Sequence, residues 1–76
     1  MTDQATLVDA SGLSCPMPLL KAKLAIADAE SGQLIELVAT DVGSLKDIPR
    51  FVERAGHQLV ELEGDKAPYR FVIKKA

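Results

Sequence analysis

Cys15 is the only cysteine of the chain and begins the sequence Cys15-Pro16-Met17-Pro18, directly ahead of an apolar run with helical spacing. If Cys15 caps this helix, Pro16 takes the first helical position, where its missing N–H would have no partner in any case. Pro18 also fits the first turn, and the Met17 amide is the donor expected to reach the sulfur. A thiolate there faces the positive end of the helix dipole, which lowers a cysteine pKa below about 8.5, and the effect is similar with Ser14 as the cap. The motif predicts a nucleophile; the alternative is the core role common for a free cysteine.

Basic side chains on the two expected helices are the next candidates. Lys23 falls within the apolar arc of the first helix, so it either extends its ammonium to water or pairs with an anion such as the sulfur. Lys21 is nearer to Cys15 in sequence but points away from it. Arg50 and Arg54 lie on the polar face of the second helix, where a solvated surface is the ordinary interpretation. We keep Lys21, Arg50 and Arg54 as candidate partner-docking residues.

The remaining polar residues give weaker signals. His57 follows a glycine and has no carboxylate or second histidine patterned near it, which favours a strand start or a surface position over catalysis. A pair between Cys15 and His57 gets no support from their spacing. Asp41 has the place of a turn residue. Because no group of residues has metal-ligand spacing, we expect neither a metal nor a cofactor.

Length and charge narrow the class of protein. A chain of 76 residues, 47% of them hydrophobic, is enough for one domain over residues 1–76 and too short for two. A net charge of -2 with scattered basic residues predicts no nucleic-acid contact. The sequence shows neither a signal peptide nor an apolar stretch of membrane-spanning length. Together with an unpaired thiol, these features predict a cytoplasmic protein.

Apolar periodicity predicts the elements that position the thiol. A helix over residues 16–29 and a second one from Ser44 as its cap are each followed by a glycine, Gly32 and Gly56, suited to a left-handed helix end. Pro49 lies near enough to the start of the second helix to be tolerated. The predicted strands cover residues 5–9, 34–40, 57–63 and 69–75.

The faces of these elements follow from alternation. The central strand directs one set of side chains to the core, namely Ile35, Leu37 and Ala39. The final antiparallel hairpin has an expected inner face of Val60, Leu62, Phe71 and Ile73. An outer apolar face would then consist of Leu34, Val38, Leu59 and Val72. The order β-α-β-α-β-β predicts an α/β two-layer sandwich, a four-stranded mixed sheet with two helices packed on one face.

The stretch from Gly12 to Lys23, with Cys-Pro-x-Pro at its centre, resembles the signature of the TusA/SirA-like sulfur-carrier family. Lys46-Asp47-Ile48-Pro49 and Gly56-His57 continue the resemblance, which spans essentially the whole chain. It implies the same β-α-β-α-β-β sandwich and sulfur carried as a persulfide on Cys15. Val42 stands where many relatives have proline. Val52 stands where some have a second cysteine, so no internal thiol would resolve the persulfide.

The resemblance implies a carrier that acts with partner sulfurtransferases and is not a stand-alone catalyst. A cysteine desulfurase or rhodanese-like protein would donate sulfur, and an acceptor protein with a reactive cysteine would receive it for tRNA thiolation, cofactor synthesis or sulfur oxidation. Pro16, Met17, Pro18 and Lys23 would shape the site. Two other hypotheses stay open: a non-catalytic interaction module in which Cys15 is structural, and a redox sensor that forms intermolecular disulfides.

Overall fold

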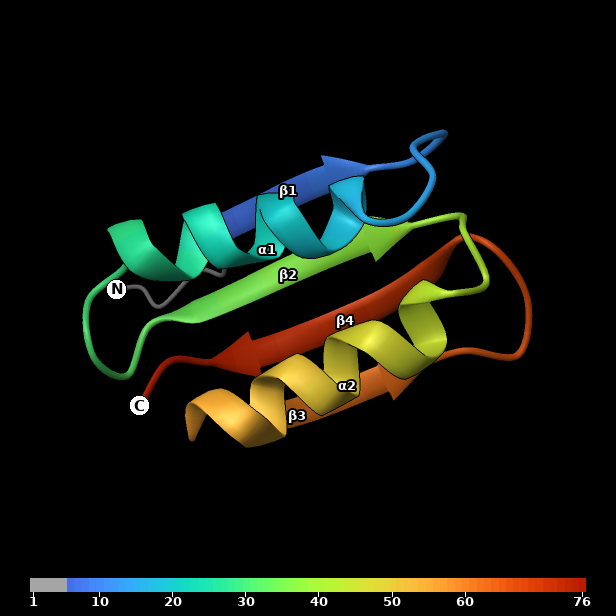
Figure 1. Ribbon diagram of the computed structural model, residues 1–76. Helices are drawn as coiled ribbons and strands as arrows, with labels where there is room; N and C mark the ends of the chain where they lie inside the picture. Colours follow the sequence, from blue (N-terminus) through green and yellow to red (C-terminus); the bar gives the residue numbers. More distant parts are fainter. Residues whose placement is uncertain (1–5) are drawn as a thin grey trace.

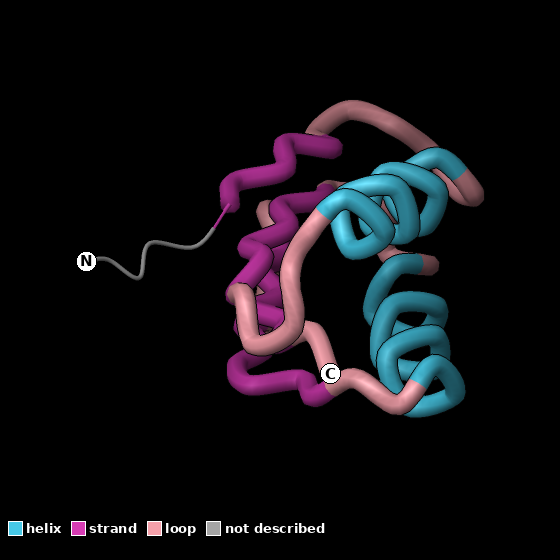
Figure 2. The backbone as a smooth tube through the Cα atoms, turned by 90° about the vertical axis from the view of Figure 1, so that its left-hand side faces the viewer, coloured by secondary structure: helices cyan, strands magenta, loops and turns pink. Residues whose placement is uncertain are grey.

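A four-stranded mixed sheet with two helices on one face forms the protein, as the sequence predicts (Figures 1 and 2). The computed structural model describes residues 6–76, so Ala5, which was predicted to begin the first strand, lies outside the described residues. The elements in chain order are β1 (Thr6–Ala10), α1 (Met17–Asp28), β2 (Leu34–Ala39), α2 (Ser44–Ala55), β3 (Gln58–Glu63) and β4 (Tyr69–Lys74).

The sheet has the strand order β1-β2-β4-β3. β1 and β2 are parallel because α1 carries the chain back across one face, whereas β4 pairs antiparallel with both β2 and β3. Parallel pairing aligns Ala10 of β1 with Ala39 of β2 at the last position of each strand. The loops that leave these two strands therefore start side by side at one end of the molecule (Figure 1).

The core lies between the sheet and the helices. Ile35, Leu37 and Ala39 alternate inward along β2 and are fully buried, which confirms the predicted face of the central strand. Phe71 and Ile73 of β4 pair with Leu37 and Ile35 and are also fully buried. The helices contribute four more buried apolar residues, Ala22 and Ile26 from α1 and Ile48 and Val52 from α2.

The two helices end in different ways. Gly56 has a φ of 82° and ends α2 in the left-handed conformation, as predicted. α1 instead ends at Asp28, and the N–H of the extended Ala29 donates to the carbonyl of Ile26. Gly32 does adopt a left-handed φ of 85°, but in the turn that leads into β2. The prediction that Gly32 ends the first helix is therefore wrong.

The second helix starts one residue earlier than predicted. Gly43 is the cap residue, and Ser44, the predicted cap, is the first helical residue and makes no capping hydrogen bond. The helix continues through Pro49, so this proline is tolerated near the first turns. The Ser44 hydroxyl is buried without a hydrogen-bond partner among the described residues.

We expect the Ser44→Ala variant to unfold at a temperature several degrees higher than the natural chain. Removing an unsatisfied buried hydroxyl and gaining helix propensity should stabilise the fold by about 1 kcal/mol, which is about 4–8 °C for a domain of this size. The control is Ser31→Ala, because the exposed Ser31 hydroxyl donates to the carbonyl of Ala76 at 3.0 Å. A melting temperature of Ser44→Ala below that of the natural chain would contradict the expectation.

A β-bulge changes which residues of β3 face the helices. The pairing with β4 shifts between Leu59 and Glu61, so Val60 is the extra residue. Leu59 pairs with Ile73 and packs against the core, whereas Val60 is 48% exposed. The predictions of an inward Val60 and an outward Leu59 are therefore wrong. Leu62 pairs with Phe71 as an inner-face residue should, but it lies at the sheet edge and is 44% exposed.

The outer face of the sheet carries a charged network as well as apolar residues. Arg70 of β4 forms ion pairs with three glutamates of the neighbouring strands, Glu36, Glu61 and Glu63. Val72, predicted to line an apolar outer surface, is only 6% exposed. Leu34 and Val38, also predicted for this face, are half-buried, and Leu7, which pairs with Glu36, is 64% exposed. The interaction-module hypothesis therefore stays open.

Candidate functional site

Cys15 lies in the loop between β1 and α1, at the end of the sheet where the parallel strands finish. The loop after β2 lies beside it, and the two are tied together where the Gly12 N–H donates to the Thr40 hydroxyl at 2.8 Å. The first turn of α2 follows that second loop. Topology therefore brings Asp41 and Asp47, remote from Cys15 in sequence, to the sulfur. The thiol is exposed.

The sulfur contacts a carboxylate directly. The Cys15 thiol donates a hydrogen bond to Oδ2 of Asp47, with 3.1 Å between the sulfur and the oxygen. Asp41 accepts a hydrogen bond from the Gly43 N–H at 3.1 Å, so it is the turn residue that the sequence predicts. Its carboxylate also approaches the sulfur. A Cβ added to Gly43 would lie 2.8 Å from Oδ2 of Asp41 and 3.0 Å from the sulfur, so only glycine leaves room for both.

These carboxylates reverse the expected acidity of the thiol. Hydrogen bonding to Asp47, then to Asp41, followed by burial and the negative charge of both groups, raises the pKa of Cys15 to about 12. A carboxylate beside a thiol favours the neutral form because it accepts the thiol proton and repels a thiolate. The prediction of a lowered pKa is therefore wrong, and in the free protein Cys15 is a thiol at neutral pH.

Helix α1 starts after the predicted cap residue. This explains why the helix dipole does not outweigh the two carboxylates in setting the pKa of Cys15. α1 begins at Met17 with Pro16 as its cap residue, so Cys15 precedes the helix. The Met17 N–H donates to the Ser14 carbonyl at 3.0 Å and not to the sulfur, contrary to the prediction. Pro18 is buried in the first turn and anchors this end of the helix.

The basic candidates lie away from the sulfur. The ammonium of Lys23 is 5.6 Å from the centre of the Phe51 ring, a cation–π contact between α1 and α2 that neither of the two alternatives for Lys23 foresaw. Lys21 lies on the side of Asp9, whose pKa is lowered first by the Ser11 N–H and in smaller part by the charge of Lys21. Arg50 and Arg54 are exposed on α2, as predicted for a polar face.

His57 does not join the thiol either. Its Nδ1 accepts a hydrogen bond from the N–H of Ala76 at 3.0 Å, and its ring lies beside Phe51 with the ring centres 6.2 Å apart. This arrangement agrees with a role at the start of a strand and not with a Cys–His pair.

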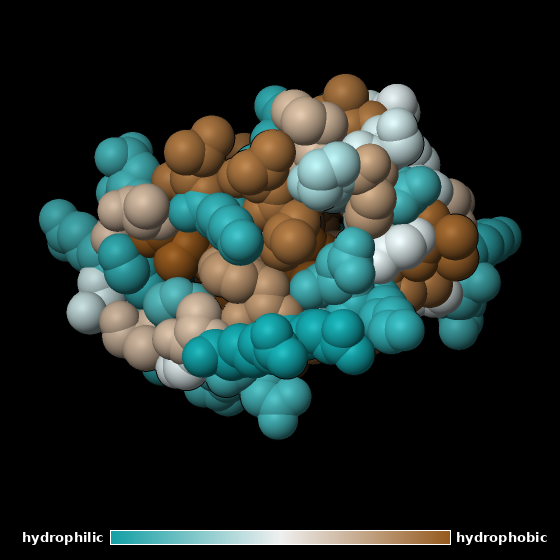
Figure 3. All heavy atoms as spheres, in the orientation of Figure 1, coloured by the Kyte–Doolittle hydropathy of each residue, from teal (hydrophilic) through white to brown (hydrophobic). Residues whose placement is uncertain are grey.

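Several large apolar side chains are exposed on α1 and in the loop after β2. Met17, Leu20 and Leu24 are spaced along one side of α1 and are 44%, 45% and 70% exposed, and Val42 in the adjacent loop is 68% exposed. Figure 3 shows hydrophobic residues gathered over α1. The sequence pattern had marked α1 as apolar but gave no sign of which residues stay uncovered.

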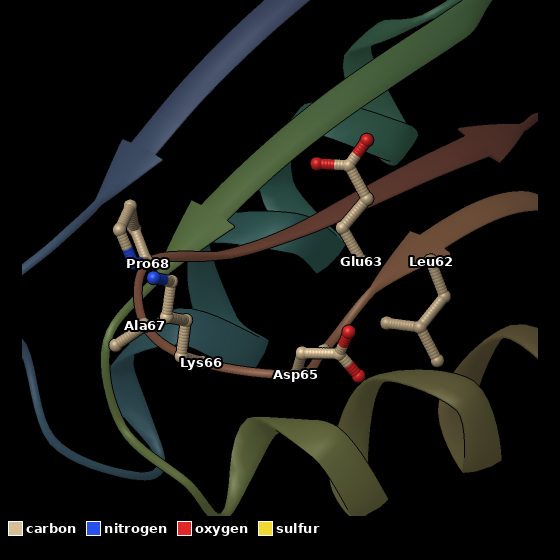
Figure 4. Close-up of a pocket in the computed structure, with 7 residues that line it drawn as sticks. Leu62, Glu63, Asp65, Lys66, Ala67 and Pro68 are labelled. Carbon is tan, nitrogen blue, oxygen red and sulfur yellow. The ribbon is translucent and has the colours of Figure 1, made fainter.

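Three other features bear on the kind of site. A cavity lined by residues 62–68 lies along the hairpin loop between β3 and β4, and none of its lining residues is Cys15, Asp41 or Asp47 (Figure 4). Within residues 6–76, no group of three histidine, cysteine or acidic residues could hold a metal ion. In the same range no helix is long and apolar enough to cross a membrane. The reactive group of this site is therefore a surface thiol.

Sequence reasoning identified Cys15 but missed Asp47 as its partner. By its place in the sequence, Asp47 is an acidic residue in the first turn of a helix, where it complements the dipole. The contact joins residues 32 positions apart and depends on how α2 docks, which periodicity does not report. The available signal was that Asp47 belongs to the stretch Lys46-Asp47-Ile48-Pro49 that carries the family resemblance.

An α/β sandwich with a single exposed thiol in a loop, away from the cavity at residues 62–68, defines a small protein that presents its reactive group on the surface. Residues 6–75 match the family model described as Sulfurtransferase TusA, and the chain belongs to this family. The "Sulfur carrier protein TusA" of Allochromatium vinosum is 41% identical over 76 residues, with both chains fully covered.

Two other proteins agree with this assignment. A "Putative sulfur carrier protein" of Archaeoglobus fulgidus is 41% identical over 69 residues, which cover 91% of this chain and 94% of that protein. The crystal structure of a SirA-like protein from Desulfitobacterium hafniense superposes with a TM-score of 0.76 at 26% identity, covering 93% of this chain and 96% of the other. Both comparisons support the family assignment and the β-α-β-α-β-β architecture.

Proposed function

We propose that this protein is a sulfur carrier in which Cys15 holds sulfane sulfur as a persulfide and passes it to the cysteine of an acceptor protein. The observation that carries the proposal is an exposed thiol, the only one of the chain, in a protein that is 41% identical over 76 residues to one named as a sulfur carrier. A surface position suits a group that must be reached by the active sites of other proteins.

Loading is a transfer of one sulfur atom between two thiols. The Cys15 thiolate attacks the terminal sulfur of a persulfide on the donor, a new S–S bond forms, and the S–S bond of the donor breaks with its thiolate as leaving group. The proton lost by Cys15 ends on the donor sulfur, so no net oxidation occurs. Unloading repeats the step with an acceptor thiolate as the nucleophile.

The absence of a second cysteine gives the loaded state its lifetime. A neighbouring thiol would attack the persulfide and release sulfide as a disulfide closes. Val52, at the position where some family members have a cysteine, is 2% exposed in the core and cannot take this role. The persulfide would then persist until another protein's thiol reaches it.

Partners of two kinds follow from this chemistry. A cysteine desulfurase or a rhodanese-like protein would supply the sulfur, and a protein with a reactive cysteine would accept it for tRNA thiolation, cofactor synthesis or sulfur oxidation. The exposed Lys21, Arg50 and Arg54 are the candidate docking residues. We place this exchange in the cytoplasm, where thiols stay reduced.

The test is to incubate the purified protein with a cysteine desulfurase and L-cysteine and to weigh it intact. We expect a mass increase of one sulfur atom that reducing agent removes, and no increase in the Cys15→Ser variant. If the natural chain gains no sulfur, or if Cys15→Ser gains as much, the carrier proposal fails. A reducible dimer formed under mild oxidation, without sulfur loading, would favour the redox sensor.

A further inference from the structure

We propose that Asp47, with Asp41 beside it, holds Cys15 as a neutral thiol in the free protein, so that the thiolate forms only when a sulfur donor brings positive charge to these carboxylates. The inference rests on the proposed function, because it concerns the same sulfur atom. It assigns a role to Asp41 and Asp47. It also predicts that the donor has a lysine or arginine beside its own persulfide.

The contacts around the sulfur of Cys15 favour its protonated form. Asp47 accepts the thiol proton in a hydrogen bond of 3.1 Å, and a carboxylate can accept it only while the sulfur is protonated. The space above the bare Cα of Gly43 is shared by the sulfur and by Oδ2 of Asp41. A thiolate in this place would face two negative charges at short range.

No cation of the described residues balances the negative charge of Asp41 and Asp47. Every ion pair formed by residues 6–76 involves Arg70, on the outer face of the sheet, so neither Asp41 nor Asp47 pairs with a cation from the described part of the chain. The groups that act on the Cys15 proton are these two carboxylates alone. Lys46, next to Asp47 in sequence, is exposed on α2 and takes no part.

A donor that brings positive charge would change the ionisation of Cys15. A cation placed against Asp41 and Asp47 occupies their oxygens, lowers the local negative potential and so favours ionisation of the thiol. The proton leaves Cys15, the thiolate attacks the terminal sulfur of the donor persulfide, and the donor thiolate that departs takes up a proton. Molecules that do not neutralise the carboxylates meet a poorly nucleophilic thiol.

The first experiment measures alkylation of Cys15 by iodoacetamide at pH 8 in full-length protein, with folding of each variant checked by circular dichroism. We expect Asp47→Asn and Asp41→Asn each to react at least about tenfold faster than the natural chain, which is the effect of lowering a pKa by one unit. The control Glu53→Gln removes an exposed carboxylate from α2 and should react at the natural rate. If both Asp variants fold and react no faster than Glu53→Gln, the inference is wrong.

The second experiment tests the charge of the donor with two small reagents that transfer an alkylthio group, a trimethylammonium and a sulfonate derivative of ethyl methanethiosulfonate. The thiolate displaces methanesulfinate from either reagent and forms a mixed disulfide. After each rate is divided by the rate with free cysteine, we expect the cationic reagent to be favoured at least about tenfold by the natural chain and by Glu53→Gln, and by less than about twofold in the double variant Asp41→Asn/Asp47→Asn. Equal preference in all three proteins would overturn the inference.

These readouts are independent of sulfur loading. If Cys15 takes up no sulfur from the desulfurase but the Asp variants still react faster, the carrier proposal fails and the role of the carboxylates stands. If sulfur is loaded normally but the variants behave like the control, the carrier proposal stands and the role of the carboxylates fails.

Discussion

At pH 8 the folded protein should react with iodoacetamide about a thousandfold more slowly than the same chain unfolded in guanidinium chloride. With a pKa raised to about 12, about one Cys15 thiol in ten thousand is ionised at pH 8, against about one in ten for the ordinary value of 9.0. Only the thiolate reacts, so the rate follows this fraction. The measurement is the time course of alkylation by intact mass, with and without denaturant.

The same shift links folding to pH. Above the unfolded pKa of 9.0, the unfolded chain loses the thiol proton that the folded chain retains, so stability should fall as pH rises from about 9 towards 12. Below pH 9 the thiol contributes no pH dependence. The Cys15→Ser variant lacks this ionisation and is the control for denaturation at pH 8 and pH 10. Equal alkylation rates for folded and unfolded protein would contradict the raised pKa.

Replacing Phe71 with alanine should remove a large share of the free energy that stabilises the fold. Phe71 is fully buried between the sheet and the helices, and Phe→Ala substitutions in cores cost about 3–5 kcal/mol. A domain of this size has a total stability of about 4–11 kcal/mol, so the loss is a large share of it. The measurement is the urea midpoint followed by circular dichroism.

Leu62→Ala is the matched control for this variant. Leu62 lies opposite Phe71 on the neighbouring strand, but 44% of it is exposed at the sheet edge. We expect its loss to cost about 1 kcal/mol, within the ordinary range for a partly exposed site. Similar shifts of the urea midpoint in the two variants would mean that the core is not centred on β4.

The order of elements and the buried face of β2 were predictable because both follow from the local spacing of apolar residues. Ile35, Leu37 and Ala39 alternate inward, and the inward positions of α2 recur with helical spacing at Ile48 and Val52. Val60 and Leu59 were assigned to the wrong faces because a bulge adds one residue to the strand, and a shift of one residue exchanges its two faces. The strand sequence alone carries no mark of that insertion.

The site was predictable only in part, because some of its residues are far apart in the sequence. Cys15 could be found because its motif is contiguous, but its acidity depends on Asp41 and Asp47, which reach it through the docking of another loop and helix. The helix-dipole argument considered α1 alone. A direct hydrogen bond from the thiol to a carboxylate outweighs a dipole whose first amide, that of Met17, already donates to Ser14.

The bulge at Val60 has a consequence for how the molecule behaves at high concentration. β3 is an edge strand, and a regular unpaired edge is a template on which a second copy can add a strand and begin to aggregate. Here the bulge interrupts the regular spacing of hydrogen-bonding groups, and Glu61 and Glu63 add negative charge along the same strand. Two copies brought together at this edge would repel each other and fail to align, which protects the protein from self-association through β3.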